Sequence, residues 1–159
     1  MNEWSHLDEN GQAIMVDITQ KDQTVRTAQA VGEIWVGCEA LIKIKNAEIE
    51  KGDVLASARI AGILAAKRTY ELIPLCHVLQ LTKCQIDFKL NENEGTVQGI
   101  CTVKTVGKTG AEMEALTGVQ IALLTIYDMC KAIHKNMVIQ NVHLLTKTGG
   151  KSGDYQWKG

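Results

Sequence analysis

The chain has 159 residues, 45% of them hydrophobic and 22% charged, a composition typical of one folded domain rather than of a disordered segment. Its formal net charge of −1 excludes a global attraction for nucleic acid or acidic membranes, so anions must be bound by local basic clusters. Five cysteines without the two-residue spacing of a zinc or thioredoxin motif favour reduced thiols in a cytoplasmic protein. We expect no signal peptide or membrane span, because no apolar run approaches the ~18 residues that a span needs.

The first half of the chain predicts one strand and two helices after a polar N-terminus that we expect to be mobile. In chain order these are the N-terminus (about 1–13), a strand (28–36), a short helix (38–47) and a long helix (54–73). Asp53 is suited to cap the start of the long helix. Pro74 is expected to end it, because the residue before a proline disfavours helical geometry.

The second half predicts a hairpin, a long helix and a last strand. Two segments that alternate apolar and polar residues flank a turn at Asn91–Gly95 and predict an antiparallel pair, 79–90 with 96–106. A helix (109–131), a strand (137–145) and a mobile glycine-rich tail (about 147–159) follow. The order predicts a single catalytic domain over 1–159 of the α+β class. We expect a ferredoxin-like sandwich with helices packed on one face of a four-stranded antiparallel sheet.

The predicted 109–131 helix carries charges among its apolar residues. Glu114, Asp128 and Lys131 fall along one stripe at helical spacing, and charge in an apolar helix is costly unless it is paired or used. The helix is therefore a candidate site wall. Thr109-x-x-Glu112 matches a capping box, although a capping residue can also contact a ligand. Asp128 and Lys131 could form a surface ion pair instead of a catalytic one.

The lengths of the helices limit how these groups can share a site. The 54–73 helix spans roughly 30 Å at 1.5 Å per residue, which places Lys51 and His77 at its opposite ends. Glu114 and Asp128 are about 21 Å apart along their own helix by the same rise. Two alternatives follow. Either several of these residues have no role in a site, or the site is built across a subunit interface.

Two glycine-lysine segments resemble phosphate-binding loops without completing the motif. Gly107-Lys108-Thr109 follows a strand and opens a helix, but a Walker motif needs glycine where Thr102 stands. The tail around Lys147 and Lys151 also lacks the motif. It could fold over an anionic ligand, and a frayed terminus is the alternative.

Five segments together resemble the cyclic pyranopterin monophosphate synthase family, also called molybdenum cofactor biosynthesis protein C. They are MVDI with Thr24 and Arg26, KGDVLASARIAGILAAKRT, LIPLCH, KTGAEMEALTGVQIALLTIYDMCKA and KTGGKSGD. The resemblance runs from about residue 6 to 154. Val78 and Ala111 depart from the family's usual proline and valine, and neither departure removes a functional side chain.

The resemblance implies a ferredoxin-like subunit in a homohexamer, a trimer of dimers with active sites at the dimer interfaces. It implies that a cyclised dihydroguanosine triphosphate is rearranged to cyclic pyranopterin monophosphate, with release of pyrophosphate, in molybdenum cofactor biosynthesis. The family's catalytic residues match Asp128, Lys51 and Lys131. The positions that match its substrate-binding residues are Asp17, Arg26, Lys67, Leu75, Cys76, His77, Glu112, Met113 and Glu114. We expect no nucleic acid or membrane partner, no protein-bound cofactor and no metal site, although Mg²⁺ could accompany the triphosphate.

The implied chemistry agrees with these residue types. Proton transfer suits a lysine whose pKa is lowered by burial or by a neighbouring lysine, near a carboxylate. Displacement of pyrophosphate needs cationic groups for the triphosphate, and Glu112 or Glu114 could bind the guanine-derived edge. Which lysine is the acid and which the base stays open. A non-catalytic ligand-sensing module is the alternative function, because fold alone does not separate it from an enzyme.

Overall fold

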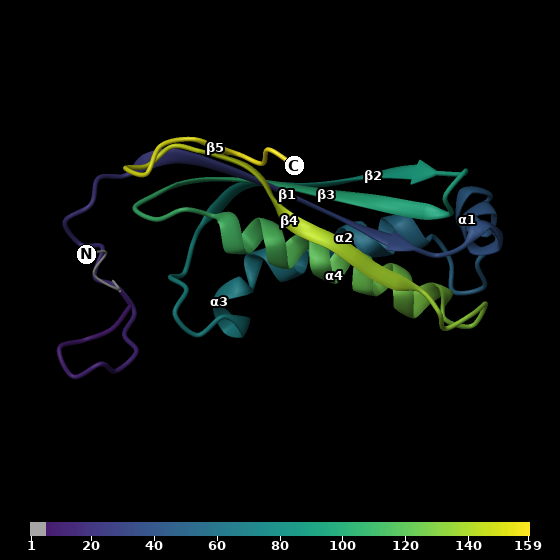
Figure 1. The fold of residues 1–159 in the computed structure, drawn as a ribbon, viewed down its shortest axis with the longest axis horizontal. Coiled ribbons are helices and arrows are strands. Elements are labelled where there is room, and N and C mark those ends of the chain that lie inside the picture. The colour runs from purple at the N-terminus through teal and green to yellow at the C-terminus, as the bar shows by residue number, and fades with distance from the viewer. Residues whose placement is uncertain (1–5) are drawn as a thin grey trace.

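The computed structural model describes residues 6–159 as an antiparallel sheet with helices on one face (Figure 1). The described elements, in chain order, are β1 (Thr24–Trp35), α1 (Cys38–Lys45), α2 (Val54–Lys67), α3 (Thr69–Leu72), β2 (Leu81–Asn91), β3 (Thr96–Gly107), α4 (Glu112–Cys130), β4 (Val138–Thr148) and β5 (Tyr155–Gln156). This confirms the α+β class and the antiparallel sheet.

The strands of the described chain lie in the order β2-β3-β1-β4-β5, so the predicted number of four strands is wrong. The extra strand, β5, comes from the glycine-rich tail in which we predicted no strand, and it pairs Tyr155 with Lys147 and Gln156 with Thr146. β1 lies at the centre and pairs along its whole length with β3. β4 also extends to Thr148, beyond the predicted end at 145.

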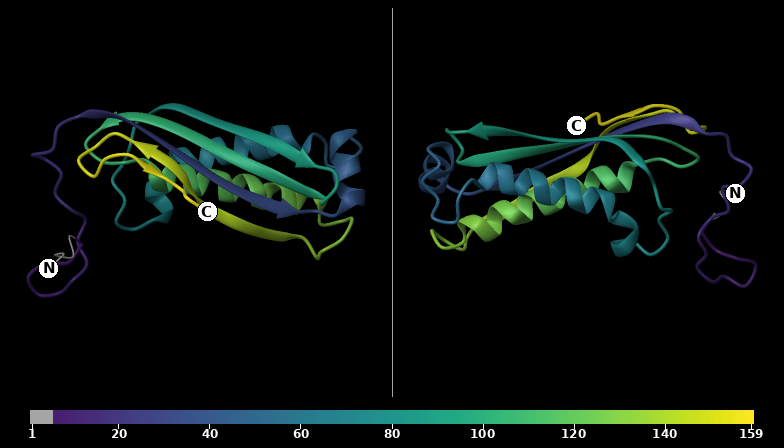
Figure 2. Two further views of the ribbon diagram at one scale, coloured as in Figure 1. Left: turned by 45° about the horizontal axis from the view of Figure 1, so that its top comes forward. Right: turned by 180° about the vertical axis from the view of Figure 1, so that it is seen from behind.

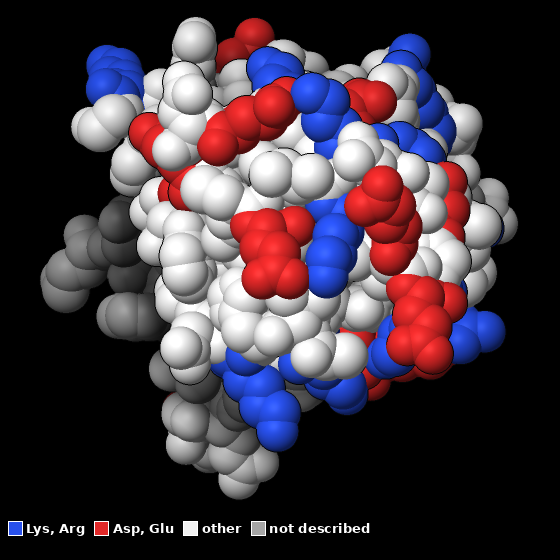
Figure 3. Space-filling model, turned by 90° about the vertical axis from the view of Figure 1, so that its right-hand side faces the viewer, with Lys and Arg blue, Asp and Glu red and all other residues white. Residues whose placement is uncertain are grey.

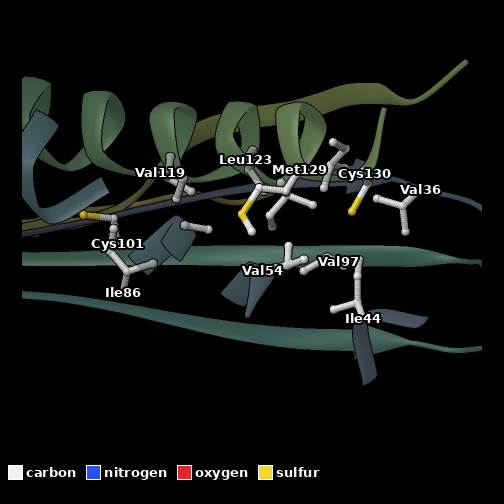
Figure 4. Close-up of a cluster of buried hydrophobic side chains, with 14 of the residues drawn as sticks. Val36, Ile44, Val54, Ile86, Val97, Cys101, Val119, Leu123, Met129 and Cys130 are labelled. Carbon is white, nitrogen blue, oxygen red and sulfur yellow. The ribbon is translucent and has the colours of Figure 1, made fainter. Parts of the chain in front are cut away.

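The core lies between the sheet and α4 because alternate strand residues point toward that helix. Ile34 of β1 and Val97 of β3 are fully buried opposite each other, and Leu123 of α4 packs against this layer (Figure 4). The other strand residues point to the uncovered face of the sheet. This period of two is what the alternating sequence predicted for β2 and β3.

α2 and α4 lie side by side across the sheet (Figure 2), and glycine permits their close approach. A Cβ on Gly62 of α2 would lie 2.7 Å from the backbone oxygen of Gly118 in α4. The side chain of Asp53 accepts a hydrogen bond from the amide of Ala56, so the predicted cap of α2 is confirmed. Lys51, just before α2, contacts Asp128 near the end of α4, so the start of α2 and the end of α4 lie at the same end of the molecule.

The predicted helix over 54–73 is interrupted. α2 ends at Lys67, Arg68 adopts φ −114°, and the short α3 continues to Leu72 before Pro74. The predicted mobility of residues 1–13 falls partly on residues 1–5, which lie outside the described residues, and for the rest it stays a prediction. In the part of the chain that the structure describes, no helix is both long and apolar enough to cross a bilayer.

Candidate functional site

The predicted site residues gather at the two ends of α4. Because α4 is one unbroken helix from Glu112 to Cys130, Glu114 and Asp128 are about 21 Å apart along its axis. We call the group at its C-terminal end, Lys51, Asp128 and Lys131, the lysine cluster. The remaining predicted residues lie toward the N-terminal end, and they are described after it.

The lysine cluster is a carboxylate held between two ammonium groups. Lys51 Nζ lies 3.0 Å from Asp128 Oδ2, and Lys131 Nζ lies 2.6 Å from Asp128 Oδ1. All three side chains are about half exposed, so a ligand could reach them. Acidic and basic side chains alternate over this end of the molecule and form no continuous patch of one sign (Figure 3).

Local folding explains the cluster. Lys131 follows the last residue of α4 but keeps helical dihedral angles, so its side chain reaches Asp128 three positions earlier. Lys51 lies in the turn before α2, which brings it to the same end. Hydrogen bonds from Lys131 and then Lys51 lower the pKa of Asp128, and Asp128 in turn raises the pKa of Lys131. A lowered lysine pKa, which we expected for proton transfer, is therefore not found at Lys131 in the free chain.

A cleft of about 350 Å³ lies at the N-terminal end of α4. Its lining includes six of the predicted substrate-binding residues, which are Leu75, Cys76, His77, Glu112, Met113 and Glu114. His77 Nε2 donates to the backbone oxygen of Val16 at 2.7 Å, so this histidine has a structural partner as well as a place in the cleft.

Glu114 is the buried carboxyl group of this cleft, with only 4% of its surface exposed. Burial raises its pKa to about 7, and the charge of the neighbouring Glu112 adds to that rise. Burial and the charge of Glu114 also raise the pKa of the Cys76 thiol. The cleft can therefore offer a carboxyl group that changes protonation near neutral pH, a property associated with functional sites.

A second cleft of about 710 Å³, which we call the basic cleft, opens beside the first and shares Glu112 with it. Its basic lining residues are Lys21, Arg26, Lys108, Lys147 and Lys151. Lys147 lies on the helix-facing side of the sheet, because it pairs with the buried Ala28 of β1. Its Nζ lies 2.9 Å from Glu112 Oε1 and 3.1 Å from Ser152 Oγ.

The predicted capping box at Thr109 is wrong. α4 begins at Glu112 with Ala111 as its N-cap, and no side chain caps it by a hydrogen bond. Glu112 instead pairs with Lys147 from β4, a partner 35 positions away that local spacing does not show. Glu112 lines both clefts, so its position is compatible with the second role considered for it, which is contact with a ligand.

Two predicted substrate-binding residues do not line these clefts. Asp17 is exposed between Val16 and Ile18, which line the first cleft, and hydrogen bonds from Thr19 lower its pKa. Lys67 is exposed at the end of α2. The structure also brings in Lys21 and Lys108, which we did not assign to the site. Only the glycine-lysine segment around Lys108 carried a signal, and it was set aside as an incomplete Walker motif.

Within residues 6–159, no three His, Cys, Asp or Glu side chains lie together in a way that could hold a metal ion. The charged groups that line the clefts are carboxylates, lysines and one arginine. Such a set can bind phosphate groups and move protons between a bound ligand and the protein.

Comparison with known proteins gives one consistent result. The model of the MoaC family matches residues 15–150. A protein of Roseiflexus sp. (strain RS-1) is 55% identical over 98% of each chain. Proteins of Clostridium botulinum (strain Alaska E43 / Type E3) and Heliobacterium modesticaldum (strain ATCC 51547 / Ice1) are each 54% identical, over 97% and 98% of each chain. All three relatives are named cyclic pyranopterin monophosphate synthase. The chain therefore belongs to the MoaC family.

Proposed function

We propose that this chain is a cyclic pyranopterin monophosphate synthase. It would rearrange (8S)-3′,8-cyclo-7,8-dihydroguanosine 5′-triphosphate to cyclic pyranopterin monophosphate with release of pyrophosphate, in molybdenum cofactor biosynthesis. By reaction type it would be a phosphorus–oxygen lyase that forms a cyclic phosphate. The observation that carries the proposal is identity above 50% over nearly the full length of relatives with that name.

The lysine cluster supports the proton transfers of this reaction. The carboxylate of Asp128 holds Lys51 and Lys131 within hydrogen-bonding distance, so two potential proton donors stand at one point. A substrate group that displaces Asp128 from one lysine would lower that lysine's pKa, because the favourable charge is removed while the second ammonium stays near. We propose this displacement as the step that prepares a lysine for acid–base work.

The N-terminal end of α4 supports substrate binding. The lysines and Arg26 of the basic cleft suit a triphosphate and the pyrophosphate that leaves, because charge-assisted hydrogen bonds to phosphate oxygens are strong. Glu112 and Glu114 lie beside it and suit the amino and amide groups of the guanine-derived ring. Leu75, Cys76, His77 and Met113 would form the remaining wall.

The distance between the two groups supports a site shared by two subunits. A separation of about 21 Å along α4 exceeds the span of one compact reacting centre. A second copy could place its own lysine cluster beside this chain's clefts. We therefore propose dimers with interface sites, assembled as a homohexamer, and a ferredoxin-like subunit in which β5 extends the order β2-β3-β1-β4.

We propose that Mg²⁺, if it is used, arrives with the triphosphate and has no site in the protein itself, and that no organic cofactor is bound. Cytoplasmic location is part of the same proposal. Adding EDTA to a turnover assay, with and without excess Mg²⁺, would show whether turnover needs Mg²⁺. Turnover that persists in EDTA would remove Mg²⁺ from the proposal.

The test of the function is incubation of the purified chain with the cyclised triphosphate. We expect pyrophosphate and, after oxidation, pterin fluorescence to appear together in equal amounts. Binding without either product would instead favour the ligand-sensing module. Hydrolysis to inorganic phosphate without a pterin would indicate a triphosphate hydrolase.

A further inference from the structure

We propose that Trp157 is a positioning residue for anion binding: it fastens the C-terminal tail to the sheet and so holds one wall of the basic cleft in place. We call residues 149–157 the strap. The inference rests on the proposed function only for the identity of the anion, taken as the pyrophosphate part of the substrate. The strap also answers a question that the sequence left open, because the tail either folds over an anion or frays.

The outer end of the strap is fastened to β4. The backbone amide of Trp157 donates to the oxygen of Leu145 at 2.8 Å. The ring of Trp157 packs on that of His143, with centroids 4.6 Å apart and planes at 40°. His143 pairs with Val31, on the face of the sheet that the helices leave uncovered. The C-terminus lies on this side of the sheet in both Figure 1 and Figure 2.

The inner end of the strap forms one wall of the basic cleft. Gly149 and Gly150 have φ values of 84° and 89°, a conformation that favours glycine. The turn passes so close to β1 that a Cβ on Gly149 would overlap the oxygen of Val25, and one on Gly150 would overlap the guanidinium of Arg26. Ser152 then contacts Lys147 Nζ at 3.1 Å. The turn thus packs against Arg26 and accepts a hydrogen bond from Lys147 through Ser152.

Apart from Trp157 and the contact of Ser152 with Lys147, few side-chain contacts attach the strap to the sheet. β5 has two residues and pairs with only Thr146 and Lys147 of β4. Within the turn, Gly149 donates to Asp154 and Gly153 donates to Gly150, contacts that shape the turn without attaching it to the sheet. A two-residue strand is weak by itself, so the aromatic contact is the main fastening of the far end.

The charges of the basic cleft explain why the position of the strap matters. Five basic side chains line the cleft. Its acidic lining residues are Asp22 and Glu112, and Glu112 is already paired with Lys147. If the strap were released, Lys151 and the backbone amides of the turn would leave the cleft. Anion affinity would fall in proportion to the fraction of molecules with a docked strap.

The experiment compares wild-type protein with Trp157→Ala, Trp157→Phe and a matched control, Trp35→Ala. Trp35 also packs on a histidine, His134, with centroids 5.6 Å apart, but it lies at the opposite end of β1 from Arg26. Pyrophosphate binding is measured by calorimetry, and cleavage by trypsin after Lys151 is followed by mass spectrometry. Neither measurement needs turnover, so a failure of the proposed function would appear separately, as wild-type protein that binds pyrophosphate but forms no pterin.

We expect Trp157→Ala to weaken pyrophosphate binding at least about threefold, the scale of one lost aromatic contact, and to speed cleavage after Lys151. Trp157→Phe should keep most of the wild-type pyrophosphate affinity and most of the resistance to cleavage after Lys151. Trp35→Ala should change neither the affinity nor the cleavage rate. With active enzyme, KM for the triphosphate should rise by the same factor while kcat stays within about twofold, because uniform binding is lost. Unchanged affinity and cleavage in Trp157→Ala, or an equal loss in Trp35→Ala, would overturn the proposal.

Discussion

The ammonium group of Lys51 donates to two atoms of Asp128, the backbone oxygen at 2.8 Å and the carboxylate at 3.0 Å, across 77 positions of sequence. Lys131 contacts the other carboxylate oxygen, so both carboxylate oxygens of Asp128 have a lysine partner in the free chain. A ligand anion that takes a donor already bound to Asp128 therefore competes with this carboxylate for the lysine. This competition links ligand binding to the protonation of the lysines.

Lys51→Ala and Lys131→Ala should each lower kcat by about 100-fold or more, the scale of a lost acid–base group. The fold should persist, because exposed ion pairs add little to stability. Turnover of the cyclised triphosphate and thermal unfolding measure the two effects. Lys43→Ala is the control, since Lys43 also forms an exposed ion pair, with Glu39 on α1. Near-normal turnover in either cluster variant would remove that lysine from the mechanism.

Mixing two inactive variants should restore activity if each site is shared by two subunits. Lys51→Ala and Arg26→Ala remove groups from opposite ends of the molecule, so a hybrid dimer would contain one intact site and one doubly damaged site. Random reassortment should recover about a quarter of wild-type activity, as expected for a two-fold interface. The variants are unfolded and refolded together, and turnover is compared with each variant refolded alone.

The matched control for mixing is Lys51→Ala with Asp128→Ala. These residues contact each other within one chain, so no hybrid can rebuild their cluster. Recovery in this control would show that the activity comes from something other than shared sites. No recovery in the first mixture, with hybrids demonstrated by mass spectrometry, would contradict an interface site.

Much of the fold followed from the sequence because its signals are local. Alternation in β2 and β3, the cap at Asp53 and the stop at Pro74 each act within a few residues. β5 was missed because its two residues have no pattern of their own and depend on the neighbouring β4. The break at Arg68 was missed because apolar spacing continues through it into α3.

The site was harder to predict because its contacts are long-range. Helix length alone correctly placed Glu114 and Asp128 in different regions, and the structure confirms one unbroken α4 between them. Local spacing assigned Glu112 to a capping box, whereas its partner Lys147 comes from the last long strand. No spacing rule in the sequence connects those two residues, so only the sheet topology reveals the basic cleft.

Glu114 should make the protein less stable as pH rises from about 4.5 to about 7, the two pKa values of this carboxyl when unfolded and folded. Over that range the unfolded chain has already lost the proton that the folded chain keeps. The unfolded state therefore gains from deprotonation while burial prevents the same gain in the folded state. Glu114→Gln, which is neutral at every pH, should be more stable than wild type by up to about 3 kcal/mol at pH 8.

The difference in the free energy of unfolding between Glu114→Gln and wild type should shrink toward pH 5, where the carboxyl of Glu114 is protonated in the folded wild-type protein. Urea unfolding of both proteins across that range, at one protein concentration, measures it. Glu71→Gln is the control, because Glu71 is exposed on α3. A difference between Glu114→Gln and wild type that does not vary with pH would show that burial does not hold the proton on Glu114.

Gly62→Ala should destabilise the protein by about 1–2 kcal/mol, although alanine is the better helix former by up to about 1 kcal/mol. The added Cβ would lie 2.7 Å from the backbone oxygen of Gly118 and 3.1 Å from Cβ of Ala122, so α2 and α4 would have to move apart. Urea unfolding measures the loss, and Ser57→Ala on the same helix should stay within about 0.5 kcal/mol of wild type. If Gly62→Ala instead stabilised the protein, the helices would have room to separate, and glycine would not be what sets their spacing.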